Sequence, residues 1–240
     1  GHVTGFVSSP IFDGTLDAKD LTLNGVSIPR AYGHAHYEGG MISLDRFGFL
    51  QGDDGSYDLE LQADTVSHAL TGNIIVQNAD LTNLCALLKQ KNDVVKGMMN
   101  ATAIVGGTAE NPSLDVEGTM AQGTIADYDV HGIEIAAKLE DHVLSITTCK
   151  GLQGDGTFEL TGTSALDGAL DLKLTARDIA LGMFTKAAGL KTDVIGTANI
   201  DATLSGNISS PEGQIALTAK NGGIQGSTFD TLTGEAKLFH

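Results

Sequence analysis

The sequence predicts a mainly β protein. We expect an elongated, repeat-built antiparallel β-sheet, folded into a taco-like trough with an apolar interior, plus two short amphipathic helices. Three observations lead to this fold class: the chain matches itself at a shift of 99 residues, most stretches alternate between apolar and polar side chains, and turn residues recur throughout. Such a pattern is typical of an array of hairpins whose neighbours stack and share one core.

The internal match is ungapped. Residues 97–139 fall on residues 196–238, so that Gly97 meets Gly196 and Pro112 meets Pro211. A shorter match places Leu50-Gln51-Gly52-Asp53 on Leu152-Gln153-Gly154-Asp155. We therefore expect residues 1–240 to form one elongated repetitive domain. Its units are about 1–96, 97–195 and a truncated 196–240.

Two-residue alternation predicts strands with one dry and one wet face. Residues 170–175 (LDLKLT) and 200–205 (IDATLS) show the pattern clearly. Turn pairs such as Asn24-Gly25, Asp167-Gly168 and Asn221-Gly222 separate the strands, which indicates a mostly antiparallel meander.

Two segments break the alternation with a helical stripe. In the first, near residues 80–90, Asp80 is the expected N-cap, and the stripe consists of Leu81, Leu84, Cys85 and Leu88. In the second, near residues 178–188, we expect Asp178 to begin the helix and Gly189 to end it, with Ile179, Met183 and Ala187 on one face. Asp178 follows Asp80 by 98 residues, so the helix belongs to the repeating unit.

One short helix per unit cannot cover about six strands. The apolar face must then close on itself as a barrel, a sandwich or a folded trough. Its side chains are mostly Ala, Val, Ile and Leu, and aromatic residues make up only 5% of the chain. An incompletely filled interior with this lining suits long aliphatic tails.

Composition excludes several functions. The net charge of −16 opposes nucleic-acid binding, which needs a basic surface, and opposes docking on an anionic membrane. No apolar run approaches the ~18–20 residues that span a bilayer. Gly1-His2 is typical of a cloning remnant, and the third unit stops within a strand. We therefore expect a fragment with open terminal strands that associates end to end.

The stretch from Gly196 to Pro211, repeated from Gly97 to Pro112, resembles TamB and AsmA-like proteins. The likeness extends to 170–179 and 152–160 and is weakest over 1–50. It implies the periplasmic part of a protein anchored in the inner membrane of a double-membraned bacterium. Such proteins form a groove-bearing β-structure linked to phospholipid transport and to outer-membrane protein assembly. The family has no catalytic residues and no cofactor to carry over.

The function we expect is non-enzymatic: the chain holds acyl chains of a phospholipid or similar lipid in an apolar groove, with an outer-membrane assembly protein as a further partner. The alternative is a structural or adhesive β-solenoid with a fully packed interior. The expected groove residues are the inward apolar positions of the strands. They are Val116, Ile133, Ile135, Leu139, Leu160, Leu172, Ile200, Leu204, Ile215 and Leu217.

Other chemistry has weaker support in the sequence. His34 and His36 would share one face of a strand, but no further ligands stand nearby to complete a metal site. Asp53 and Asp155 lie in Gly-rich turns without a calcium-loop pattern, so hairpin turns explain them better. Cys85 and Cys149 are expected to be buried free thiols, and whether they pair stays open.

Overall fold

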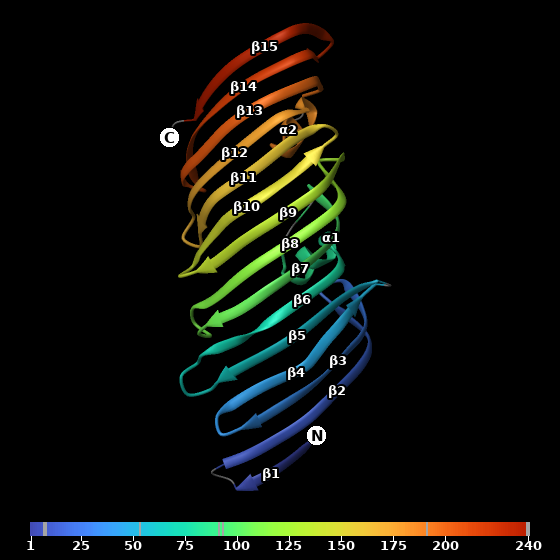
Figure 1. The fold of residues 1–240 in the computed structure, drawn as a ribbon, viewed down its shortest axis with the longest axis vertical. Coiled ribbons are helices and arrows are strands. Elements are labelled where there is room, and N and C mark those ends of the chain that lie inside the picture. The colour runs from blue at the N-terminus through green and yellow to red at the C-terminus, as the bar shows by residue number, and fades with distance from the viewer. Residues whose placement is uncertain (7–8, 53, 91, 93, 191, 239–240) are drawn as a thin grey trace. The chain divides into compact units, whose positions relative to one another are not determined.

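The computed structural model describes residues 1–6, 9–52, 54–90, 92, 94–190 and 192–238, so predicted turn residue Asp53 lies outside the described residues. Within these ranges the chain forms fifteen strands and two helices (Figure 1). The first half contains β1 (His2–Phe6), β2 (Ser9–Leu23), β3 (Val26–Glu38), β4 (Met41–Gln51), β5 (Gly55–Asp64), β6 (Leu70–Asp80), α1 (Leu81–Leu87), β7 (Val95–Gly107) and β8 (Pro112–Ile125). The second half contains β9 (Tyr128–Glu140), β10 (Val143–Gln153), β11 (Gly156–Ala165), β12 (Ala169–Ala180), α2 (Leu181–Ala187), β13 (Val194–Asn207), β14 (Ser210–Ile224) and β15 (Ser227–Leu238).

The strands follow one another in the sheet in chain order, from β1 to β15. Neighbouring strands run antiparallel, for example β2 with β3 and β12 with β13. This confirms the prediction of a mainly β, repeat-built antiparallel sheet with two short helices. Because each strand pairs with its neighbour in sequence, a short turn is enough for every connection that no helix interrupts.

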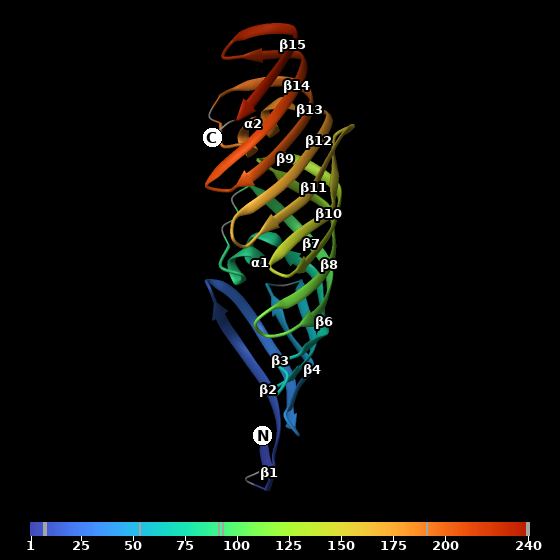
Figure 2. The same ribbon diagram turned by 90° about the vertical axis from the view of Figure 1, so that its left-hand side faces the viewer.

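The chain divides into two compact units. Unit 1 contains Gly1–Asn92, Met98–Gly118 and Leu139–Asp141, and unit 2 contains Asp93–Gly97, Thr119–Lys138 and His142–His240. Unit 1 thus holds β1–β6 and α1, and unit 2 holds β10–β15 and α2. In each unit the helix lies against one face of curved strands (Figure 2).

The repeat is visible in the elements themselves. Six strands and a helix occur twice, and α1 and α2 start 100 residues apart, at Leu81 and Leu181. Strands β7 and β13 start at Val95 and Val194, which are 99 residues apart, as in the sequence match. Equivalent glycines also share a positive φ, which is 78° at Gly107 and 89° at Gly206. The backbone therefore repeats as well as the sequence.

Bulges interrupt several long strands. Because each bulge adds one residue, the apolar side chains before and after it still face the same side of the sheet. Asn78 in β6 and Asp178 in β12 have φ values of 49° and 52°, and the register shifts there, between Val76 and Ala79 and between Ala176 and Ile179. Each extra residue bends its strand and increases its twist. The predicted turn at Asn221-Gly222 is wrong for this reason. Asn221 has a φ of 48° and lies inside β14, at a register shift against β13.

The helices correct one part of the prediction. Asp80 caps α1 as expected, since its Oδ1 accepts a hydrogen bond from Asn83 N at 2.9 Å. Asp178, however, caps nothing: it is the bulge residue of β12, Ile179 belongs to that strand, and α2 begins at Leu181. The helices therefore repeat at 100 residues and not at 98. Gly189, with a φ of 75°, ends α2 as predicted.

Candidate functional site

The candidate site is the apolar face of the sheet. In unit 2, strand pairing aligns the apolar side chains in rows that cross β11 to β15. Residues directly opposite in an antiparallel pair share a face, so each row lies on one side of the sheet. The three central rows are Phe158–Ala176–Ile200–Leu217–Gly234, Leu160–Leu174–Ala202–Ile215–Ala236 and Gly162–Leu172–Leu204–Gly213–Leu238.

The opposite face of the same strands is polar. It carries rows such as Thr175–Asp201–Ala216–Glu235 and Lys173–Thr203–Gln214–Lys237. No position in the three apolar rows has a charged side chain. The alternation of the sequence thus keeps charged side chains out of the three apolar rows and places them on the opposite face of these strands.

Helix α2 covers one end of the apolar face. Leu181 and Met183 of the helix are buried, and so are Ile179 and Ile200 of the strands it contacts, with Ile200 fully inaccessible. The ring of Tyr128 also packs beside this helix, with Lys186 Nζ 5.5 Å from the ring centre. This end of the face is an ordinary packed core.

Beyond α2 the apolar face is partly open, although Leu170 of β12 is buried there. Ile215 is 37% exposed and Leu144 is 38% exposed, while Leu172 and Leu204 are half-buried. Large apolar side chains that remain this accessible beside a continuous apolar surface are typical of a binding surface. The face therefore combines a closed end under α2 with an accessible end beyond it.

Two hydrogen bonds anchor α2 at the covered end. Asn199 Oδ1 accepts a bond from the backbone N–H of the bulge residue Asp178 at 2.9 Å, and Gln153 Oε1 accepts one from Ala180 N at 2.8 Å. These bonds fix the strand end from which the helix emerges. The sheet thereby holds the helix over its apolar face.

Unit 1 repeats the arrangement. The buried residues Tyr57, Val76 and Ala79 form a cluster against which Leu84 and Leu87 of α1 pack. The anchoring bonds recur as well, from Asn78 N to Asn100 Oδ1 at 2.8 Å and from Asp80 N to Gln51 Oε1 at 2.8 Å. No residue of α1 is fully buried, whereas three residues of α2 are. Helix α1 therefore covers its unit less tightly.

The apolar face of unit 1 also contains a hollow of about 410 Å³, a volume within the size range of ligand pockets. Its lining includes Gly14, Leu16, Gly33, Ala35 and Phe47. The rings of Phe12 and Phe47 lie where side chains at Gly14 and Gly33 would stand. The two glycines let the rings lie close to the backbone and leave open apolar space beside them.

The ten predicted groove residues lie on the apolar face. Pairing puts Leu160, Leu172, Ile200, Leu204, Ile215 and Leu217 in the three rows of unit 2. Ile133 lies on the same side of the sheet as Phe158, since both side chains lie against Gly151. Ile135 and Leu139 are two and six residues further along β9 and therefore face the same side. Val116 shares a face with Gly118, which approaches Ala101 of β7. Ile133 and Ile200 are buried, so they belong to the covered part.

Sequence reasoning missed the hollow of unit 1, because residues 1–50 match the repeat least. The signal that could have found it is the alternation of Phe12, Gly14 and Leu16, since a glycine at an inward position leaves room for a neighbouring ring.

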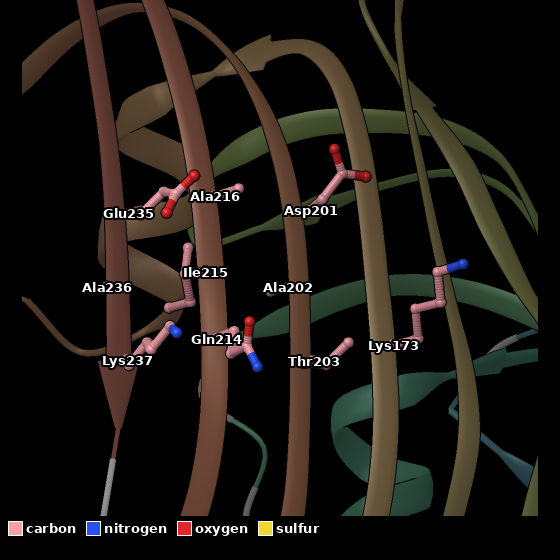
Figure 3. A pocket seen from close by; sticks show the side chains of 10 residues that line it. All are labelled: Lys173, Asp201, Ala202, Thr203, Gln214, Ile215, Ala216, Glu235, Ala236 and Lys237. Atoms are coloured by element: carbon pink, nitrogen blue, oxygen red, sulfur yellow. The ribbon is translucent and has the colours of Figure 1, made fainter.

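The polar face of unit 2 carries another, smaller hollow of about 260 Å³ (Figure 3). It is lined by both charges, including Lys173, Glu235 and Lys237, and Figure 3 shows α2 on the far side of the sheet. Asp201 at its rim is already paired, 2.7 Å from Arg177 Nη2. Opposite charges that are mixed in this way favour no single class of charged ligand.

His34 and His36 lie on the polar face of unit 1, both beside Asp13. His34 Nε2 is 3.1 Å and His36 Nδ1 is 3.3 Å from an Asp13 oxygen, and these bonds lower the pKa of Asp13. Within the described ranges, no group of three or more His, Cys, Asp or Glu side chains is placed to hold a metal ion. Cys85 and Cys149 are free thiols that are only partly buried, and burial raises the pKa of Cys149.

Comparison with known proteins returns nothing: no family model, no curated protein and no solved structure matches the chain. None of the helices in the described part of the chain is long and apolar enough to cross a membrane.

Proposed function

We propose that this chain is a non-enzymatic lipid-binding segment that holds acyl chains against the apolar face of its sheet. In this proposal it belongs to a periplasmic, inner-membrane-anchored protein that carries phospholipid between the inner and outer membranes, assists outer-membrane protein assembly, or does both. The ligand is a phospholipid or another acyl lipid.

The observation that carries the proposal is the open end of the apolar face. Rows of aliphatic side chains cross several strands without a charged residue, and members near β15 stay accessible, as at Ile215 (37%) and Leu238 (50%); Leu144 on the same face is 38% exposed. Burying such surface is favourable at about 25 cal/mol per Å². An acyl chain laid along the rows would bury it without needing a polar partner.

The alternative, a structural or adhesive β-solenoid with a fully packed interior, requires these residues to be covered. Within unit 2 most of the buried residues of this face lie near α2; Leu170 at the other end of β12 is buried too, but Ile215 and Leu144 are not. The hollow of about 410 Å³ in unit 1 also favours a ligand over a filled core. These observations support the lipid-binding function over the structural one.

The test compares two substitutions on neighbouring residues. Leu204→Asp puts a carboxylate on the apolar face, and Thr203→Asp puts the same group on the polar face of the same strand. We expect protein purified from a double-membraned bacterium to contain acyl lipid by mass spectrometry. Leu204→Asp should reduce this lipid several-fold, because an unpaired carboxylate is costly beside apolar chains, and Thr203→Asp should not.

Two outcomes would contradict the proposal. If neither the unchanged protein nor Thr203→Asp contains or takes up lipid, the apolar face does not bind acyl chains. If Leu204→Asp unfolds by circular dichroism while Thr203→Asp stays folded and lipid-free, the packed structural function is the better one.

A further inference from the structure

Two polar groups are buried without a good partner beneath helix α1 of unit 1. Gln51 is 3% exposed and Tyr57 is 4% exposed. Tyr57 belongs to the apolar cluster against which Leu84 and Leu87 of α1 pack, and the Gln51 side chain lies near its hydroxyl. Among the described residues, neither Gln51 Nε2 nor the Tyr57 hydroxyl makes a hydrogen bond of good geometry. Unpaired polar groups in such a place destabilise the folded state, so they are rarely retained without a use.

The second repeat shows that the fold does not require this pair. Gln153 corresponds to Gln51, and the side-chain oxygen of each glutamine accepts a backbone N–H at the end of the strand before the helix, at 2.8 Å in both repeats. Phe158, however, occupies the place of Tyr57, and Gln153 is only partly buried. Unit 1 thus has a hydroxyl beside an amide where the other repeat has a hydrocarbon ring.

The two groups can donate hydrogen bonds to one ligand atom. Gln51 Oε1 already accepts from Asp80 N at 2.8 Å, which leaves the two N–H groups of Nε2 as donors, and the Tyr57 hydroxyl supplies a further donor beside them. Donors placed together suit an acceptor oxygen. Burial raises the pKa of Tyr57 to about 12, and the negative charge of Asp80 contributes to this rise. A neutral oxygen therefore fits here better than an anionic one.

Helix α1 covers these donors only lightly. No residue of this seven-residue helix, all of which the structure describes, is fully buried, whereas three residues of α2 are. Lys89 ends α1 with a strained positive φ of 57°, where α2 ends on a glycine. A hydrogen bond from Asn24 Nδ2 to Leu87 O, at 3.0 Å, ties the end of α1 to the turn between β2 and β3. Lifting α1 would open the two donors to the apolar face.

We infer that the Gln51 amide and the Tyr57 hydroxyl form a binding site for one neutral acceptor oxygen of a lipid, such as an ester carbonyl, and that α1 is the lid over this site. This role rests on the proposed lipid-binding function and adds where the polar end of the lipid is held. The closed lid leaves the donors unpaired and the bound oxygen pairs them, so binding favours the lifted lid.

The probes are methyl oleate, a neutral ester, and octadecene, a hydrocarbon of similar length without oxygen. Displacement of a fluorescent acyl probe measures the affinity of each. We expect Tyr57→Phe to weaken methyl oleate binding about fivefold, the effect of one hydrogen bond between neutral groups, and to leave octadecene binding unchanged. Tyr37→Phe removes a hydroxyl elsewhere in unit 1 and should change neither. Because the second repeat has phenylalanine at this position, Tyr57→Phe should fold.

Infrared spectroscopy gives a readout that packing alone would not change. The probe is methyl oleate with a carbon-13 label at its carbonyl. We expect its C=O band at lower wavenumber in the unchanged protein than in Tyr57→Phe, because a donated hydrogen bond weakens the C=O bond.

Asn24→Gly tests the lid. Glycine keeps the positive φ of 51° at this turn but removes the hydrogen bond to Leu87 O. We expect faster amide exchange in α1, unchanged exchange in α2, and several-fold tighter binding of methyl oleate, because the open state that binds becomes more populated.

Four outcomes would overturn the inference. If Tyr57→Phe weakens both probes equally, Tyr57 acts through packing. If it weakens neither, the two groups hold at most a water molecule, while lipid binding itself stands. If neither probe binds the unchanged protein, the proposed lipid-binding function fails too. If Asn24→Gly accelerates exchange in α1 without changing the affinity for methyl oleate, α1 is not a lid over the site.

Discussion

Tyr57 and Phe158 occupy equivalent places in the two repeats, opposite Val76 and Ala176. Tyr57 is 4% exposed and stacks on Phe49 with ring centres 4.3 Å apart. The Gln51 side chain lies near the Tyr57 hydroxyl, but in the described part of the chain the hydroxyl makes no hydrogen bond of good geometry. Burial, with a smaller effect from the charge of Asp80, raises the pKa of Tyr57 to about 12, although Gln51 slightly lowers it. The second repeat has Phe158 at this position and so buries no hydroxyl group.

We predict that Tyr57→Phe increases the free energy of unfolding by about 1 kcal/mol, since it removes a buried unpaired hydroxyl. In the unchanged protein the folded state holds the phenolic proton more tightly than the unfolded state, whose tyrosine pKa is about 10. The stability from this group is therefore present below pH 10 and is lost as pH rises from 10 to about 12.

Urea unfolding from pH 7 to 11 checks this prediction. The alkaline decrease in stability should be smaller in Tyr57→Phe, whereas Tyr37→Phe, at a partly exposed tyrosine of the same unit, should leave it in place. An unchanged pH profile in Tyr57→Phe would show that this phenol does not control alkaline stability.

A second pair of equivalent residues, Lys89 and Gly189, ends the two helices. The N–H groups of Lys89 and Gln90 donate to Ala86 and Cys85 at 3.0 and 2.8 Å, and Gly189 and Leu190 make the same bonds to Lys186 and Thr185. Both terminal residues have a positive φ, 57° at Lys89 and 75° at Gly189. Lysine is strained in this conformation, and glycine is not.

We predict that Lys89→Gly increases the free energy of unfolding by about 0.5–1 kcal/mol, since glycine relieves the strain that a side chain has at positive φ. The reverse change, Gly189→Lys, should destabilise the protein by at least as much. Thermal unfolding followed by circular dichroism measures both. A lower midpoint for Lys89→Gly would mean that the lysine side chain makes a contact worth more than the strain.

At the scale of elements, both repeats contain a β-bulge that is followed by a short helix. The bulge residues Asn78 and Asp178 turn their strands, and asparagines on the next strand, Asn100 and Asn199, accept their N–H groups. A short helix follows each time and lies over the apolar face. Helices of this length are marginal in isolation, so their stability comes from this anchoring and packing.

We therefore predict that Asn199→Ala lowers the free energy of unfolding by about 0.5–1.5 kcal/mol, since it removes one hydrogen bond. Amide exchange in α2 should accelerate more than exchange in β14. Thr218→Ala, directly opposite Asn199 on the polar side of β14, is the matched control and should have little effect. Equal acceleration in α2 and β14 would show that the asparagine does not act on the helix in particular.

At the scale of the whole molecule, the net charge bears on which lipid the proposed binding function would favour. The net charge of −16 lies outside the apolar rows and creates a field that repels anionic headgroups. Salt weakens this field, because the screening length falls from about 10 Å at 0.1 M to about 3 Å at 1 M.

We predict that the chain takes up fluorescent acyl lipid faster from zwitterionic vesicles than from vesicles that contain anionic lipid. The difference should shrink at high salt. A preference for anionic vesicles at low salt would mean that a local basic surface, rather than the net charge, governs the encounter. The prediction rests on the proposed lipid-binding function.

Much of the fold could be predicted from the sequence. Alternation requires strands, because only a two-residue period puts every second side chain on one face. The bulges were not predicted. Asn221-Gly222 has the composition of a turn but forms a bulge, and Asp178 has the composition of a cap but sits in a strand. Local composition cannot separate these states, because Asn, Asp and Gly all tolerate the positive φ that a turn and a bulge both use.

The sequence by itself determined the repeat, the strand order of a meander, the two helices and the apolar or polar face of each alternating position. Only the tertiary structure decided which apolar residues are covered. Ile200 and Ile215 have the same pattern in the sequence, yet Ile200 is fully buried and Ile215 is 37% exposed. The reason is physical: alternation fixes the face of a side chain, whereas burial depends on where α2 crosses that face, and two hydrogen bonds between strands distant in sequence set that position.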